Sequence, residues 1–224
     1  MKRKRIITIF VAVLMPIMLG CSPKATKPEN SIQDGSALET AQPRPGDYFI
    51  VRSEDDAEEG TSGQVDLTNE DLDLGQLSGF ESAKAIGIRF EGIRVAKGQK
   101  ITRAFLQFTM EGNRTKAKPT ELTIRAELSP NASSFKEEAR NISSRKLTEA
   151  SVKWVPEAWN PEQVSDRRAR TPDLSSLILE LVNQDDWEEG NALALIITGT
   201  GERDAISFDG GGKSEGPMLR IETS

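Results

Sequence analysis

Beyond residue 46, apolar and polar residues alternate along much of the chain with a period of two. In 120–128 every second residue is apolar: Leu122, Ile124, Ala126 and Leu128. Residues 100–110 repeat this alternation, except that Phe105 stands among the polar positions. A period of two places successive side chains on opposite faces of a strand, so both segments are predicted to be half-buried strands.

Several shorter segments also have the composition of strands. They are apolar runs bounded by Gly, Pro, Asn or Asp, the residue types that favour turns. The further predicted strands are 47–52, 64–67, 85–90, 151–154, 192–198, 205–208 and 218–222.

One segment changes to the spacing of a helix, with apolar residues three or four positions apart: Leu174, Leu177, Ile178, Leu181 and Val182. Before them, Thr171 suits an N-cap, Pro172 suits the first helical position, and Asp173 favours the positive end of the helix dipole. A single short helix among many strands predicts an all-β fold, namely an antiparallel, jelly-roll-like β-sandwich. The helix is expected to cover an outer face or an end of one sheet, with Phe105 beneath it.

Residues 1–21 combine a basic start, a short apolar run and a cysteine behind a small residue. Four cations at 2–5 precede an apolar stretch, 6–18, that is too short to span a bilayer. Met18-Leu-Gly-Cys21 resembles a lipobox, so we interpret 1–20 as a lipoprotein signal peptide and Cys21 as the lipid-bearing residue. The alternative is a buried N-terminal helix, but a soluble core gives no reason for four consecutive cations. Because Ser22 is not acidic, the expected location is the outer membrane.

Residues 21–45 are predicted to be a flexible tether. They contain four prolines, few large apolar residues and no period that would bury one face. Residues 46–224 are then about the size of one domain and are long enough to bury a core.

The content of reactive side chains excludes several chemistries. The chain has one cysteine and no histidine. With Cys21 lipidated, no thiol remains, which excludes disulfides, thiol nucleophiles, Cys or His zinc sites and proton relays through imidazole. Carboxylates are abundant, but a glycosidase pair is defined by a separation in space that the sequence does not show. We therefore expect a protein that is not an enzyme.

The mature chain is expected to be acidic. Residues 2–5 hold four of the 29 Lys and Arg residues and none of the 35 Asp and Glu residues, which leaves 25 cations against 35 anions and a net charge of −10. Such a surface repels nucleic-acid phosphates and anionic lipid headgroups. We therefore expect no nucleic-acid binding, and membrane association through the lipid anchor alone.

A run of carboxylates follows the first predicted strand: Asp55, Asp56, Glu58 and Glu59. Like charges this close need solvent or a cation to screen them, so the run is interpreted either as a structural Ca2+ site or as a solvated acidic loop. Any bound metal should be Ca2+ rather than a transition metal, because the domain offers hard oxygen ligands without thiolate or imidazole. Asp71–Gly75 is not an EF-hand, because Ser82 stands where the closing carboxylate is required.

The segment Gly210–Ser214 is not a phosphate-binding loop, because Ser207 replaces a required glycine and Gly216-Pro217 follows where a helix should begin. A Gly-rich hairpin that joins the strands 205–208 and 218–222 is predicted instead.

Tryptophan offers flat apolar surfaces on which sugar rings stack. Trp154 continues a strand alternation and is expected in the core, and Trp187 is expected to pack beneath the helix. Trp159 lies between Pro156 and Pro161 in a predicted loop, where it either is exposed to bind a ligand or anchors the loop.

Six short blocks carry a resemblance to a known family: Ile86–Phe90, Ile101–Phe108, Asn141–Arg145, Arg170–Ser176, Trp187–Asn191 and Ile197–Gly201. In this order they resemble β-sandwich modules of bacterial secreted and surface proteins, whose broad relatives are the DNRLRE-type, carbohydrate-binding-like jelly rolls. The DNRLRE string itself is absent. The resemblance implies a β-sandwich module. Together with the predicted lipid anchor, it leads us to expect a non-catalytic envelope-anchored module that binds carbohydrate, and the alternative is a structural or protein-binding accessory lipoprotein without a glycan ligand.

Overall fold

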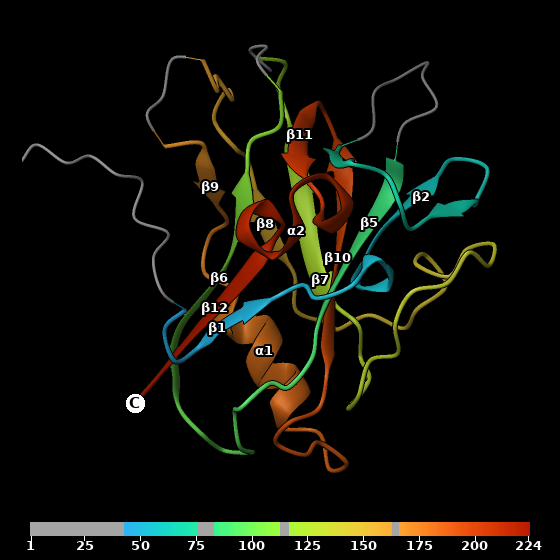
Figure 1. Ribbon diagram of the computed structural model, residues 1–224. Helices are drawn as coiled ribbons and strands as arrows, with labels where there is room; N and C mark the ends of the chain where they lie inside the picture. The colour runs from blue at the N-terminus through green and yellow to red at the C-terminus, as the bar shows by residue number, and fades with distance from the viewer. Residues whose placement is uncertain (1–42, 76–82, 113–116, 163–165) are drawn as a thin grey trace, which may run out of the picture. The chain divides into compact units, whose positions relative to one another are not determined.

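Two antiparallel sheets pack face to face in the computed structural model, which describes residues 43–75, 83–112, 117–162 and 166–224 (Figure 1). The four-stranded sheet has the order β1 (Asp47–Phe49), β12 (Met218–Thr223), β6 (Ile101–Thr109) and β9 (Arg168–Arg170). The six-stranded sheet has the order β3 (Val65–Asp66), β2 (Asp56–Gly60), β5 (Ala83–Phe90), β10 (Leu193–Thr200), β7 (Glu121–Ala126) and β8 (Val152–Trp154).

A third, two-stranded sheet pairs β4 (Asp71–Leu74) with β11 (Arg203–Ile206). It contacts β5 and β10 of the larger sheet and β6 of the smaller one, and Leu72 and Leu74 of β4 are buried in the main core. The helical segments are η1 (Ser53–Asp55), α1 (Ser175–Val182) and α2 (Phe208–Glu215). The antiparallel β-sandwich with a short helix that the sequence predicted is therefore confirmed.

The main core lies between the two large sheets. The inward residues of β6 and β7 are buried in one cluster: Leu106, Phe108, Leu122 and Ile124. Phe108 stacks on Trp154 with ring centroids 5.7 Å apart and planes at 11°. The strand register inferred from the alternation in 100–110 and 120–128 is therefore confirmed.

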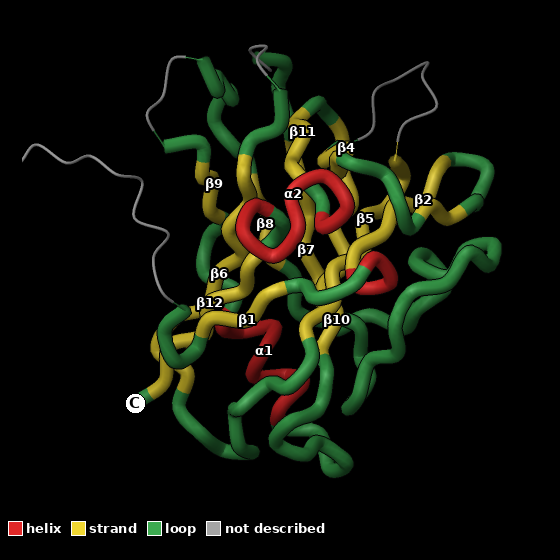
Figure 2. The backbone as a smooth tube through the Cα atoms, in the orientation of Figure 1, coloured by secondary structure: helices red, strands yellow, loops and turns green. Residues whose placement is uncertain are grey.

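Helix α1 closes one end of the sandwich, because it contacts β6 and β7, which belong to different sheets. Figure 2 shows it as a short helix below the strands. The helix begins at Ser175, so the prediction that Thr171 is its N-cap was wrong. The Thr171 hydroxyl instead accepts a hydrogen bond from Leu106 N, and Asp173 accepts one from Ser175 N.

Phe105 lies on the opposite face of β6 from the core residues Ala104 and Leu106. The guanidinium carbons of Arg103 and Arg170 each lie 5.0 Å from its ring centroid, and the side chain is only 4% exposed. Two cation–π contacts therefore cover this ring, in place of the helix that was expected to do so.

The outer face of the six-stranded sheet is covered as well. Ala57, Ala85, Ala194 and Ile196 pack there against Ala132, Phe135 and Ile142 from the segment between β7 and β8. Gly87 makes room for this layer, because a Cβ atom at that position would lie 2.4 Å from the Phe135 ring. Burial on both faces explains why β10 is an almost continuous apolar run.

The predicted hairpin between 205–208 and 218–222 was wrong. β11 pairs with β4, whereas β12 pairs with β1 and β6, and α2 lies between them. The Ser207 hydroxyl accepts a hydrogen bond from Gly210 N and so caps this helix, and Gly212 gives it a kink with φ of 60°. At Gly210 any Cβ would collide with the Glu70 carbonyl oxygen, so the glycines allow close packing rather than a tight turn.

Strands β2, β4 and β9 were not predicted, because their sequences are rich in charged residues. No helix among the described residues is long and apolar enough to cross a membrane.

Removing the Phe108 ring should leave a cavity beside Trp154. We expect Phe108→Ala to lower the free energy of unfolding by about 3–5 kcal/mol in chemical denaturation. Glu121→Ala, at an exposed position of β7, should change it by less than about 0.5 kcal/mol. Equal effects would contradict the assignment of inward and outward faces.

Candidate functional site

The acidic run does not form a loop. Asp55 ends η1, whereas Asp56, Glu58 and Glu59 belong to β2. Their exposed fractions are 1%, 2%, 9% and 0% for Asp55, Asp56, Glu58 and Glu59, so the interpretation as a solvated acidic loop was wrong. Strand geometry sends consecutive side chains to opposite faces, and the four carboxylates do not gather around one point.

Two of these carboxylates are held by groups from other segments. Asp55 pairs with the Arg89 guanidinium at 2.5 Å and lies 3.3 Å from Arg52 Nε. Glu59 Oε2 accepts hydrogen bonds from Ile142 N and Ser143 N at 3.0 and 2.7 Å. The first set of contacts joins η1 to β5, and the second joins β2 to the layer that covers the outer face of the sheet.

Asp56 and Glu58 each accept a backbone N–H from a different element. Asp56 Oδ2 accepts from Phe208 N at the start of α2, at 2.8 Å. Glu58 accepts from Asp73 N at 2.5 Å and from the Asn69 side chain at 2.8 Å. Burial raises the pKa of both carboxyls to about 7, and neighbouring carboxylates add to the effect.

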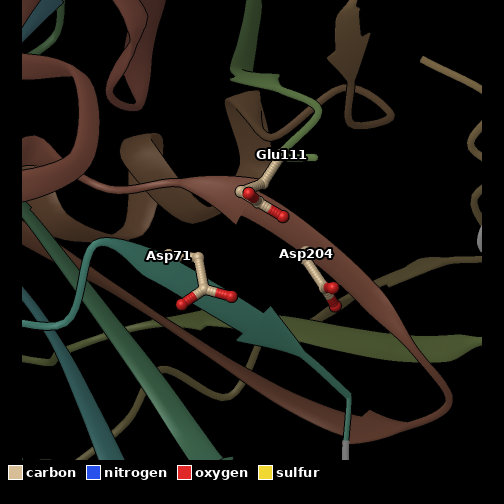
Figure 3. Close-up of side chains that lie close together, drawn as sticks. All are labelled: Asp71, Glu111 and Asp204. Carbon is tan, nitrogen blue, oxygen red and sulfur yellow. The ribbon is translucent and has the colours of Figure 1, made fainter. Parts of the chain in front are cut away.

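A different set of carboxylates does converge. Oxygen atoms of Asp71, Glu111 and Asp204 lie within 4.8 Å of one another, and we call these three residues the acidic trio (Figure 3). Asp71 belongs to β4, Asp204 to β11, and Glu111 follows β6. A β-bridge between Met110 and Ala205, together with the 2.8 Å bond from Glu111 N to Asp204 O, brings the end of β6 to β11.

The acidic trio offers only oxygen ligands, which suit Ca2+ better than a transition metal. Its members come from three segments that are far apart in the chain, so no single sequence motif contains all three. Among the described residues, these are the carboxylates that the structure brings within reach of one ion.

A polar pocket of about 870 Å3 lies between the β2–β3 hairpin, the start of β4 and residues 137–139. We call it the hairpin pocket. Hydroxyl, amide and carboxyl groups dominate its lining, which comprises Glu58, Gly60, Ser62, Gln64, Val65, Asp66, Thr68, Asn69, Asp73, Glu137 and Ala139. Sequence analysis missed it, because most of its lining comes from segments without a recognisable motif.

The tryptophans do not form a binding platform. Trp159 is 2% exposed, and its ring centroid lies 6.4 Å from that of Trp154. Its interpretation as an exposed ligand-stacking residue was therefore wrong. The loop that carries it is drawn inward by Arg203, whose guanidinium donates to the carbonyl oxygens of Glu157 and Pro156. Trp187 donates to the Val95 carbonyl oxygen and is buried, and Trp154 is in the core as predicted.

Residues 1–20, interpreted as a signal peptide, and Cys21 lie outside the described residues, so the signal peptide and the lipidation both stay predictions. Neither the protein-family models nor the curated proteins contain a match to this chain. The case for a function therefore depends on the described residues themselves.

The buried acids Asp56 and Glu58 predict an unusual pH dependence of stability. In the unfolded chain they lose their protons near the ordinary values of 3.8 and 4.5, whereas in the folded chain they keep them up to about 7. Between these values the folded state binds more protons, so its stability is greatest at the acidic side and is lost as the pH rises. We expect the free energy of unfolding to be roughly 2–4 kcal/mol higher at about pH 5 than at about pH 8.

Chemical denaturation across this pH range measures the effect. Asp56→Asn combined with Glu58→Gln keeps a hydrogen-bond acceptor at each position but removes the ionisation, so the variant should have a much flatter profile. A profile as steep as that of the unmodified protein would show that other groups are responsible.

Proposed function

We propose that this protein is a non-catalytic binding module of the bacterial cell envelope and that its ligand is a glycan held in the hairpin pocket. A lipid on Cys21 would anchor it to the outer membrane, and the proline-containing segment 21–45 would act as the tether. The observation that carries the proposal is the pocket itself, whose volume of about 870 Å3 falls in the range of about 300–1,000 Å3 that suits small ligands.

The chemistry of the lining favours a hydroxyl-rich ligand. Gln64, Thr68 and Asn69 provide amide and hydroxyl groups that can both donate and accept, and the neighbouring carboxylates are strong acceptors for sugar hydroxyls. The burial of Trp159 moves the expected contact surface away from aromatic stacking and toward hydrogen bonding. The alternative is a protein partner without a glycan, and that function does not require a ligand in this pocket.

A glycan array probed with the full-length chain in detergent tests the proposal. Gln64→Ala and Thr68→Ala should each weaken binding to the recognised glycan by about fivefold, because each loses about one hydrogen bond. Thr102→Ala is the matched control, because Thr102 is exposed on β6, is not among the described residues that line the pocket, and its hydroxyl donates to the Glu222 carbonyl oxygen. If no glycan binds while an envelope protein co-purifies with the chain, the accessory role replaces this proposal.

We also propose that the acidic trio holds a structural Ca2+ ion. Three carboxylates whose oxygens lie within 4.8 Å repel one another, and a divalent cation would relieve that repulsion while joining β4, β11 and the end of β6. The position of the proposed ion thus differs from the one suggested by the acidic run Asp55–Glu59.

Millimolar Ca2+ should raise the melting temperature, and a chelator should lower it, because a ligand that binds only the folded state stabilises it by mass action. Glu111→Gln should abolish this response. Glu70→Gln is the control, because Glu70 is exposed beside the trio without belonging to it. A melting temperature that is indifferent to both calcium and chelator would remove the ion from this site.

A further inference from the structure

The described residues that line the hairpin pocket include acidic side chains but no basic ones. Four of its described lining residues carry a carboxyl group, namely Glu58, Asp66, Asp73 and Glu137, and no Lys or Arg is among the described residues that line it. The four groups come from β2, β3, β4 and the segment before residue 139, so they face the pocket from more than one side.

Two cations of the covering segment are paired with carboxylates outside the pocket lining. Lys136 Nζ lies 3.6 Å from Glu138, and Arg145 pairs with Glu127 at 2.6 Å and stacks on Phe135. The Arg140 side chain lies alongside Gly63, between the lining residues Ser62 and Gln64, so this cation lies next to the pocket without being among its lining residues. Of the charged residues in the covering segment, Glu137 is therefore the one found among the described residues that line the pocket.

Glu58 lines the pocket from β2. It is 9% exposed, and the Asn69 amide and Asp73 N–H hold its carboxyl group in place. Burial is the main reason that its pKa is raised to about 7, and the charges of Asp73 and Asp71 raise it further. A cation in the pocket would favour the ionised form of Glu58 and would also screen Asp66 and Glu137.

We infer that the ligand of the hairpin pocket is an amine-bearing sugar, in which protonated amino groups meet the carboxylates and hydroxyls meet the neutral polar groups. This inference rests on the proposed glycan-binding function. Ser62, Gln64 and Thr68 provide the neutral contacts, whereas an ammonium group can donate three hydrogen bonds to surrounding carboxylates. Acidic glycans are disfavoured by the same charges, and a fully N-acetylated glycan lacks the cation.

Isothermal titration calorimetry with the full-length chain in detergent, at low salt and about pH 6, tests the inference. The probes are tetrasaccharides of glucosamine, N-acetylglucosamine and glucose, together with tetralysine as a cation without a sugar ring. We expect the glucosamine tetramer to bind at least tenfold more tightly than either neutral tetramer and more tightly than tetralysine. Binding should weaken as salt is added, because the interacting charges are partly exposed.

Two isosteric variants test whether the carboxylates of the hairpin pocket cause the preference for the glucosamine tetramer. Glu137→Gln and Asp66→Asn should each weaken binding of the glucosamine tetramer by about fivefold, because each removes one charge near the ammonium groups. The Asp66 replacement keeps the oxygen that accepts from Thr68 N, so the turn should persist. Glu138→Gln is the matched control, because Glu138 is the exposed neighbour that faces Lys136 rather than the pocket.

The outcomes separate the inference from the function on which it rests. A neutral tetramer that binds as tightly as the glucosamine tetramer would overturn the amine preference but would leave the glycan module standing. Equal binding of tetralysine would overturn a sugar ligand in favour of a cationic peptide. If none of the saccharides binds, here or on the array, both the inference and the proposed function fail.

Discussion

Buried carboxylates require partners, and this requirement organises one whole side of the molecule. Asp55, Asp56, Glu58 and Glu59 lie within the five positions 55–59, and each is at most 9% exposed. An unpaired buried charge is costly, so the chain around them must supply guanidinium or N–H groups. The partners come from β5, α2, β4 and the turn at Ile142, which makes β2 the point where these separate segments are joined.

The same arrangement brings acidic groups to the surface beside β2. The bond from the Asp73 N–H to Glu58 holds β4 against β2, and β4 also contacts β5 and β10 of the larger sheet. Asp71 and Asp73 both face away from the core. Asp73 then lines the hairpin pocket, whereas Asp71 joins Glu111 and Asp204 in the acidic trio. The glycan and calcium proposals therefore concern neighbouring parts of one acidic surface, and both depend on how β4 is placed.

Several expectations about individual residues depended on neighbours that the sequence does not reveal. Trp159 lies between two prolines in a loop, which favours exposure, yet Arg203 draws that loop inward from a strand more than 40 positions away. The glycines at 210–212 are typical of a hairpin turn, but Gly210 is required by close contact with Glu70. The charged residues of β2 suggested a solvated loop, because local composition cannot show that Arg89 and the backbone of Phe208 will meet them.

The sequence by itself determined the β-sandwich class, most of its strands, the single amphipathic helix and the inward faces of β6 and β7, because a period of two or of 3.6 residues is a local property. Its lack of histidine and its single cysteine also limited the available chemistry without any structure. Only the tertiary structure decided which strands pair, where the acidic residues are buried and which groups form the acidic trio and the hairpin pocket. Those outcomes depend on contacts between residues such as Asp71, Glu111 and Asp204, whose proximity is created by strand pairing and leaves no local pattern in the chain.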